Sequence, residues 1–213
     1  MPSPLKSSPY RLLVEGPDDQ WSVINLLTRH SYAWDDSSVV RPYVHPTGGI
    51  NPLLDSLPVA LKTYERLGLV VDADLSIGNR WVSVRTRLVD LGFAVPDAPL
   101  AGGLVVERTS DGKRVGVWLM PDNVSPGILE DFLAKLIPAG DPSWSHAGLS
   151  TTTARGLGAP LQAKDQAKGA IHAWLAWRED PGQPFGTAIT AHVLGHDSPE
   201  ALLFVAWFRR MFE

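Results

Sequence analysis

Cysteine is absent from the chain, and this absence excludes several kinds of chemistry. Disulfides, thiolate zinc sites and cysteine nucleophiles are impossible, so carboxylates and histidines remain as metal ligands. A strong excess of one charge is also lacking, because the formal net charge is -4 and the sequence pI is near 5.8. No global positive field therefore draws the protein to nucleic acid or to an anionic membrane. Any contact with nucleic acid must be local or helped by a partner.

Long apolar runs and a nucleotide-binding loop are lacking as well. No stretch approaches the ~18 apolar residues that a membrane span needs. We therefore expect no membrane contact and a cytoplasmic location. The Gly-x-x-x-x-Gly-Lys-Ser/Thr loop that cradles phosphates in ATPases occurs nowhere in the sequence.

What is present is an ordinary globular composition. The chain has 213 residues, of which 44% are hydrophobic and 20% are charged, and this is enough to bury a real core. Apolar runs that end in turn residues predict strands, and apolar positions at helical spacing predict helices. In chain order, we expect a strand at 11–14, a helix at 18–29, a strand at 39–45, a helix at 51–66, a strand at 67–74, a helix at 77–91, a hairpin of strands at 104–107 and 115–120, and a helix at 126–137.

The remaining part of the chain has a different pattern. Residues 139–160 are rich in Gly, Ser, Thr and Pro, which predicts a loop. Loops of this length are often functional lids, or they contain short helices that the pattern does not reveal. Two helical regions follow, at 164–177 and 199–212. The sequence thus predicts an α/β core at 9–137 and a helical C-terminal extension at 138–213, packed together as one unit.

Acidic residues mark the ends of two of the expected strands. Glu15 and Asp19 follow the first strand, and Asp72 and Asp74 end the third. If these strands are parallel neighbours, their carboxyl ends share one edge of the sheet and bring the four side chains together. In extended backbone, Asp72 and Asp74 would also point the same way. Such close carboxylates repel one another unless a cation neutralises them, so we expect a site for one or two Mg²⁺ or Mn²⁺ ions.

The order of these motifs resembles the Toprim (topoisomerase-primase) superfamily. The shared features are an apolar strand followed by Glu-Gly-x-Asp-Asp at residues 15–19, and an apolar strand that ends in Asp-Ala-Asp at residues 72–74. The chain is most similar to small stand-alone Toprim-like proteins related to the OLD-type (overcoming lysogenization defect) nucleases. That branch carries a Leu-Glu pair after the fourth strand, which here is matched by Glu130. It also carries a later basic residue, for which Lys168 is the best match and Lys164 the alternative.

This resemblance implies a fold and a function. The fold is a Toprim-like parallel sheet of four strands flanked by helices. The function is a Mg²⁺-dependent nuclease that acts on DNA or RNA, in which Glu15 and Lys168 are catalytic and Lys168 adds positive charge beside the scissile phosphate. Phage defence with a separate ABC-type ATPase is implied as the context. The implied metal ligands are Glu15, Asp19, Asp72, Asp74 and Glu130.

A second class of function stays open. The chain could be a catalytically weak Toprim-like module that binds other proteins, and its acidic pI favours this alternative because free nucleases usually carry more basic surface. The alternative keeps the acidic site for metal binding and structure. A homo-oligomer is compatible with either function.

Several residues allow two interpretations. Amides of the turn at Thr47, Gly48 and Gly49 could face a phosphate, although the residues favour a plain turn. Arg80 could contact phosphate beside Asp74 or lie on the solvated face of a helix. Asp18 and Asp19 could serve only as residues of a helix N-terminus. The tryptophans at the C-terminal end could pack in the core or form a partner surface.

Overall fold

The computed structural model describes residues 6–36 and 38–213, which form an α/β fold around a five-stranded mixed sheet. The strand order is β2-β1-β3-β5-β4, in which β4 runs antiparallel to β5 and the other pairs are parallel. The sheet therefore has one strand more than the four expected, because the first arm of the predicted hairpin joins it at the edge. The strands are β1 (Tyr10–Val14), β2 (Tyr43–Pro46), β3 (Arg66–Asp72), β4 (Leu104–Glu107) and β5 (Arg114–Met120).

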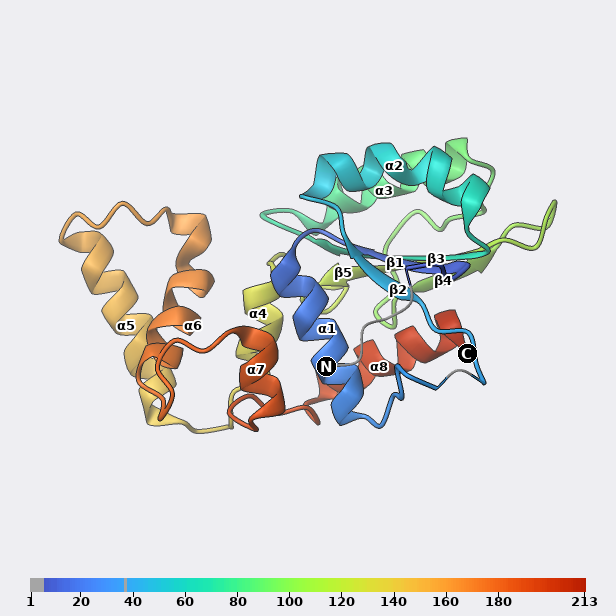
Figure 1. Ribbon diagram of the computed structural model, residues 1–213. Coiled ribbons are helices and arrows are strands. Elements are labelled where there is room, and N and C mark those ends of the chain that lie inside the picture. Colours follow the sequence, from blue (N-terminus) through green and yellow to red (C-terminus); the bar gives the residue numbers. More distant parts are fainter. Residues whose placement is uncertain (1–5, 37) are drawn as a thin grey trace.

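Helices cover both faces of the sheet (Figure 1). Helices α2 and α3 lie on one face, α1 and α8 lie on the other, and α5 and α6 stand beyond the sheet, at the end opposite to the β4–β5 turn. The helices are α1 (Pro17–Arg29), α2 (Ile50–Thr63), α3 (Ile77–Asp90), α4 (Leu129–Ala134), α5 (Pro142–Gly156), α6 (Gln166–Ala176), α7 (Phe185–Thr190) and α8 (Pro199–Phe212), with a short 3₁₀ turn at Ala163–Asp165. In the described part of the chain, no helix combines the length and hydropathy that a membrane span requires.

The prediction of a loop at residues 139–160 is wrong, because most of this segment forms α5. Asp141 begins this helix by accepting the N–H of Ser143 at 2.8 Å, and Pro142 occupies the first turn. Only Ala147 and Thr151 of α5 are buried, so its apolar stripe is too thin to be recognised in the sequence. The short helix α7 was not expected either, and the second strand begins at Tyr43 instead of residue 39.

The two faces of the sheet bury separate hydrophobic clusters, and the C-terminal tryptophans contribute to one of them. Trp174 and Trp207 are almost completely buried, and the indole N–H of Trp207 donates to the Leu104 carbonyl at 2.9 Å. Trp177 is 45% exposed. Core packing is therefore the role of Trp174 and Trp207, whereas Trp177 lies at the surface.

Two paired glycines set how closely α8 approaches the sheet. Gly68 of β3 and Gly116 of β5 are partners in the ladder. A Cβ atom on Gly68 would lie 3.0 Å from the Phe212 ring, and one on Gly116 would lie 2.8 Å from the sulfur of Met211. Because neither strand carries a side chain there, the end of α8 packs directly against the backbone.

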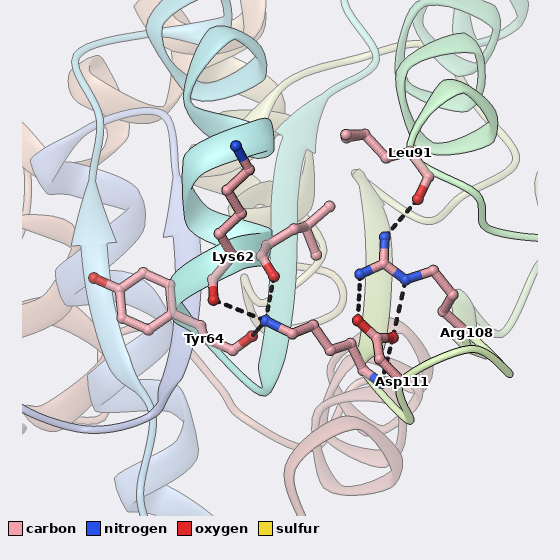
Figure 2. Close-up of polar contacts among 7 residues, drawn as sticks. Lys62, Tyr64, Leu91, Arg108 and Asp111 are labelled. Carbon is pink, nitrogen blue, oxygen red and sulfur yellow. Dashed lines mark hydrogen bonds and ion pairs between the residues drawn. The ribbon is translucent and has the colours of Figure 1, made fainter.

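The turn between β4 and β5 closes the amino ends of the parallel strands (Figure 2). The ammonium of Lys113 donates to the carbonyls of Leu61, Lys62 and Tyr64 at the C-terminal end of α2. Arg108 donates to the Leu91 carbonyl at 2.6 Å, at the end of α3, and it also pairs with Asp111. Cations of the turn thus satisfy carbonyls that both helices leave free.

Candidate functional site

Glu15 lies where β1 passes into α1, beside the end of β3. Its Oε1 accepts the backbone N–H of Asp72 at 2.9 Å, because β1 and β3 are parallel neighbours and their ends are level. Burial raises the pKa of Glu15, although this hydrogen bond opposes the rise. The expectation that the two acidic strand ends meet at one edge is thus met in the structure.

Asp19 is both a helix-start residue and a member of the acidic cluster. Its Oδ2 accepts the N–H of Gly16 at 2.9 Å, and the residue is only 7% exposed. Burial raises its pKa to about 7, and the charges of Glu15 and Glu130 add to this effect. Asp18, in contrast, is exposed. Asp19 therefore caps the start of α1 and also belongs to the acidic cluster, so the capping interpretation covers only one of its two roles.

Asp72 lies at the centre of the cluster. Its Oδ1 accepts the N–H of Leu129 at 2.9 Å, which ties β3 to the start of α4. Burial, followed by the charges of Asp19, Glu15, Glu130 and Asp74, raises its pKa to about 9. All four of the other predicted carboxylates are therefore within electrostatic reach of Asp72.

Asp74 does not continue the strand, and the expected extended alternation is wrong at this residue. The strand ends at Asp72, and Asp74 adopts a left-handed φ of 53°. Its backbone exchanges two hydrogen bonds with Gly127, of 2.9 and 2.8 Å, and its side chain forms an ion pair with Arg80. The bridge to Gly127 turns the chain out of the sheet, so the carboxylate is 58% exposed.

Arg80 supports this corner from α3. Its Nε donates to the Asp72 carbonyl at 2.7 Å while its terminal nitrogen pairs with Asp74. Arg80 therefore does not lie on a solvated helix face, and both of its contacts are already made within the protein, so its guanidinium is not free to bind a phosphate in this arrangement. Arg85 and Arg87 make contacts elsewhere, with Asp97 and Ser83.

Glu130 enters the cluster from α4 and has a cation beside it. The residue is 5% exposed, and its Oε1 lies 3.2 Å from the ammonium of Lys168 on α6. The charge of Glu130 raises the pKa of Lys168. Of the two candidate lysines, Lys168 therefore contacts the cluster, whereas Lys164 is exposed in the 3₁₀ turn.

The turn at residues 47–49 has little left to offer a phosphate. The N–H groups of Gly48 and Gly49 both donate to the Glu15 carbonyl, at 3.0 and 2.9 Å. The Thr47 hydroxyl donates to the carbonyls of Val14 and Gly49. The amides of Gly48 and Gly49 are therefore not free to bind a phosphate, and the predicted substrate-binding role gains no support from them. Their hydrogen bonds hold the backbone of Glu15 in position instead.

The donor chemistry of the cluster fits a hard divalent cation. Carboxylate oxygens are the ligands that Mg²⁺ and Mn²⁺ prefer, and buried carboxylates that raise one another's pKa need a positive charge nearby. The positions of the side chains do not form a cage, however. Among residues 6–36 and 38–213, no group of three or more acidic or histidine side chains is arranged to hold a metal ion.

A cleft of about 720 Å³ opens beside the cluster. Its walls come from the start of α3, the loop before α4 and the 3₁₀ turn before α6, with Asp74 and Arg80 at the border of the cluster. The sequence did not indicate this cleft. The third wall depends on how the hairpin of α5 and α6 packs, and the region of α5 was expected to be a loop.

Comparisons with known proteins identify a family and no relative of known activity. No curated protein and no solved structure matches the chain. One family model matches residues 9–213, and its description is "Protein of unknown function (DUF3226)". The match covers the sheet, the acidic cluster and the C-terminal helices. The chain therefore belongs to the DUF3226 family.

Proposed function

We propose that the protein is a Mg²⁺- or Mn²⁺-dependent phosphodiesterase that acts on DNA or RNA. The observation that carries this proposal is the convergence of the charges of Glu15, Asp19, Asp74 and Glu130 on Asp72, whose pKa is raised to about 9. A protein gains no stability from buried carboxylates that repel one another, so such a cluster favours a functional role. The same arrangement supports the proposed kinship with Toprim nucleases.

The carboxylates divide into two sets with different roles. Asp74 and Glu130 already have Arg80 and Lys168 as cationic partners. Glu15, Asp19 and Asp72 form no ion pair within the described residues, so these three would hold the metal once their side chains turn toward a common point, which they do not share in this arrangement. When bound, the metal would activate water and offset negative charge on the leaving oxygen.

Lys168 is suited to contact the phosphate. Its side chain is 51% exposed although its ammonium touches a buried carboxylate, so a phosphate oxygen can approach it from solvent. In this role Lys168 would stabilise charge that develops on the phosphate during cleavage. Arg80 would hold Asp72 and Asp74 in place through its two contacts.

One observation favours a second function. Because no three acidic side chains surround a common point in the described residues, the structure is also compatible with a catalytically weak module that binds protein partners. Any ATPase that takes part in either function would be a separate protein, since the chain carries no phosphate-binding loop of its own.

A cleavage assay tests the proposal. Purified protein should nick plasmid DNA or cut RNA in Mg²⁺ or Mn²⁺ and lose this activity in EDTA. Asp72→Ala should abolish cleavage, whereas Asp55→Ala, which removes an exposed carboxylate from α2, should leave it unchanged. Cleavage that survives Asp72→Ala would overturn the nuclease proposal, and the absence of Mn²⁺ binding in calorimetry would overturn the metal site.

A further inference from the structure

We propose that the cleft beside the acidic cluster receives one unpaired nucleoside, so that the substrate is single-stranded where it is cleaved. This inference rests on the proposed function, because it names the substrate class of the same site. The cleft volume of about 720 Å³ lies within the usual range for small-molecule sites. Arg80 joins the two sites, since it lines the cleft and contacts both Asp72 and Asp74.

The lining suits the uncharged part of a nucleotide. Leu75, Pro126 and Ile128 offer apolar surface on which a base can lie. Asn79 and Lys164 offer polar groups, and within the described residues their side chains have no hydrogen-bond or ion-pair partner. A few polar groups on an apolar wall are typical of sites that recognise a small ligand.

The charges of the cleft argue against a second phosphate as the occupant. Asp74, Asp131 and Asp165 line it together with only two cations, Arg80 and Lys164. The lining is therefore slightly acidic and would repel a phosphate. A neutral base and sugar face no such repulsion, while the phosphate that follows can lie at Lys168 and the acidic cluster.

The residue types of the lining also favour a single strand. A base inside a duplex is stacked and paired, and it must be extruded before it can enter a pocket, at a cost of a few kcal/mol. No aromatic side chain is among the residues that line the cleft to offset this cost by stacking. An unpaired base carries a smaller penalty, so we infer that single-stranded DNA or RNA binds and that duplex binds weakly.

The test measures binding separately from cleavage. The probes are a fluorescein-labelled oligothymidylate of about 12 nucleotides, the matching oligouridylate, an abasic oligomer of the same length and a duplex. Anisotropy titrations in Ca²⁺ and in EDTA should show that the single strands bind about tenfold more tightly than the abasic oligomer and the duplex.

Two variants then locate the base in the cleft. Ala163→Leu fills the cleft from its exposed third wall, and Ala159→Leu places the same change at an exposed position of the same connection, outside the lining. Ala163→Leu should remove the preference for a base over an abasic site, and Ala159→Leu should keep it. Asn79→Ala should weaken oligothymidylate binding about fivefold if its amide contributes a typical hydrogen bond.

The outcomes separate this inference from the proposed function. Equal binding of single strand and duplex, equal binding of oligothymidylate and abasic oligomer, or an unchanged preference in Ala163→Leu would each overturn the nucleoside site. Such results together with metal-dependent cleavage would leave the nuclease intact. A base preference that Ala163→Leu removes, in a protein that does not cleave, would support the nucleoside site and end the nuclease proposal.

Discussion

The two ends of the parallel strands differ in how their charges are paired. At the amino ends, Lys113 donates to backbone carbonyls, and Arg108 donates to a carbonyl and pairs with Asp111. At the carboxyl ends, three carboxylates lie together without an ion pair in the described part of the chain: Glu15, Asp19 and Asp72. The difference appears in the pKa values. Hydrogen bonds from Arg108 lower the pKa of Asp111, while burial and like charges raise that of Asp72 to about 9. The paired charges at the amino ends therefore stabilise the fold, whereas the carboxylates at the carboxyl ends destabilise it unless a cation binds there.

The largest expected effect is the pH dependence of the metal-free protein. In the unfolded chain Asp72 ionises near its ordinary pKa, whereas the folded protein keeps it protonated up to about pH 9. The folded state binds more protons in this window, so the free energy of unfolding should fall as the pH rises from about 4 to about 9. A pKa raised from 3.8 to about 9 corresponds to a loss on the order of 7 kcal/mol, measured by urea unfolding in EDTA.

Asp72→Asn sharpens this prediction. Asparagine carries no charge in either state and can still accept the N–H of Leu129, so the variant should be more stable than the wild type at pH 8 and less dependent on pH. Asp111→Asn is the matched control at the amino ends of the strands. Because the pKa of Asp111 is lowered, its contribution to the free energy of unfolding has the opposite pH dependence: it is present above the ordinary pKa and lost on acidification. A wild-type protein that becomes more stable from pH 5 to pH 9 would contradict the comparison.

The next effect is stabilisation by a divalent cation. At pH 8, Mn²⁺ at about a hundredfold excess over its dissociation constant should raise the free energy of unfolding by about 2.7 kcal/mol. Asp72→Ala should abolish this increase, and Asp111→Ala should retain it. Equal stabilisation of the two variants would mean that the ion binds elsewhere.

Removal of the cation beside Glu130 should have a smaller effect. Lys168→Met leaves a buried carboxylate without its partner, at a cost of about 2 kcal/mol, which is below the usual cost of breaking a buried pair because Lys168 is half-exposed. Chemical unfolding of the single variants and of the double variant Glu130→Gln/Lys168→Met measures the coupling. The double variant should recover most of the loss, and strictly additive losses would show that the pair does not interact.

The smallest effect belongs to the amino end. Lys113→Met removes the donor to the last carbonyls of α2 and should cost about 1 kcal/mol, because water replaces most of the lost hydrogen bonds. The loss should be the same at pH 5 and pH 8, and Mn²⁺ binding in calorimetry should not change. A loss that varies with pH would mean that the two ends of the sheet are coupled.

Much of the acidic edge could be predicted from the sequence, because it depends on local patterns. An apolar run before Glu15 and another before Asp72 predict two strands, whose carboxyl ends share one edge if the strands are parallel neighbours, as they are in the structure. What could not be predicted is the balance of charge there. The burial that raises the pKa of Asp72 and the pairing of Glu130 with Lys168 depend on the packing of α4 and α6, which no local pattern contains.

The errors in the fold have a related origin. Helix α5 buries only two of its residues, so its stability comes from packing against α6, where Gly169 leaves room for Leu161 and Thr151. Asp74 leaves the extended conformation because its backbone pairs with Gly127, a residue far along the chain. In both cases a tertiary contact overrides the local pattern.

The two glycines under α8 have a consequence for how the family can vary. A Cβ atom at Gly116 would lie 2.8 Å from the Met211 sulfur, and one at Gly68 would lie 2.7 Å from the Leu12 side chain and 3.0 Å from the Phe212 ring. A relative with alanine at position 116 should therefore carry a smaller residue than methionine at position 211. Positions 116 and 211 should change together across an alignment, as should positions 68 and 212. Such covariation would reveal the close packing of α8 on the sheet, which the sequence of either strand alone does not show.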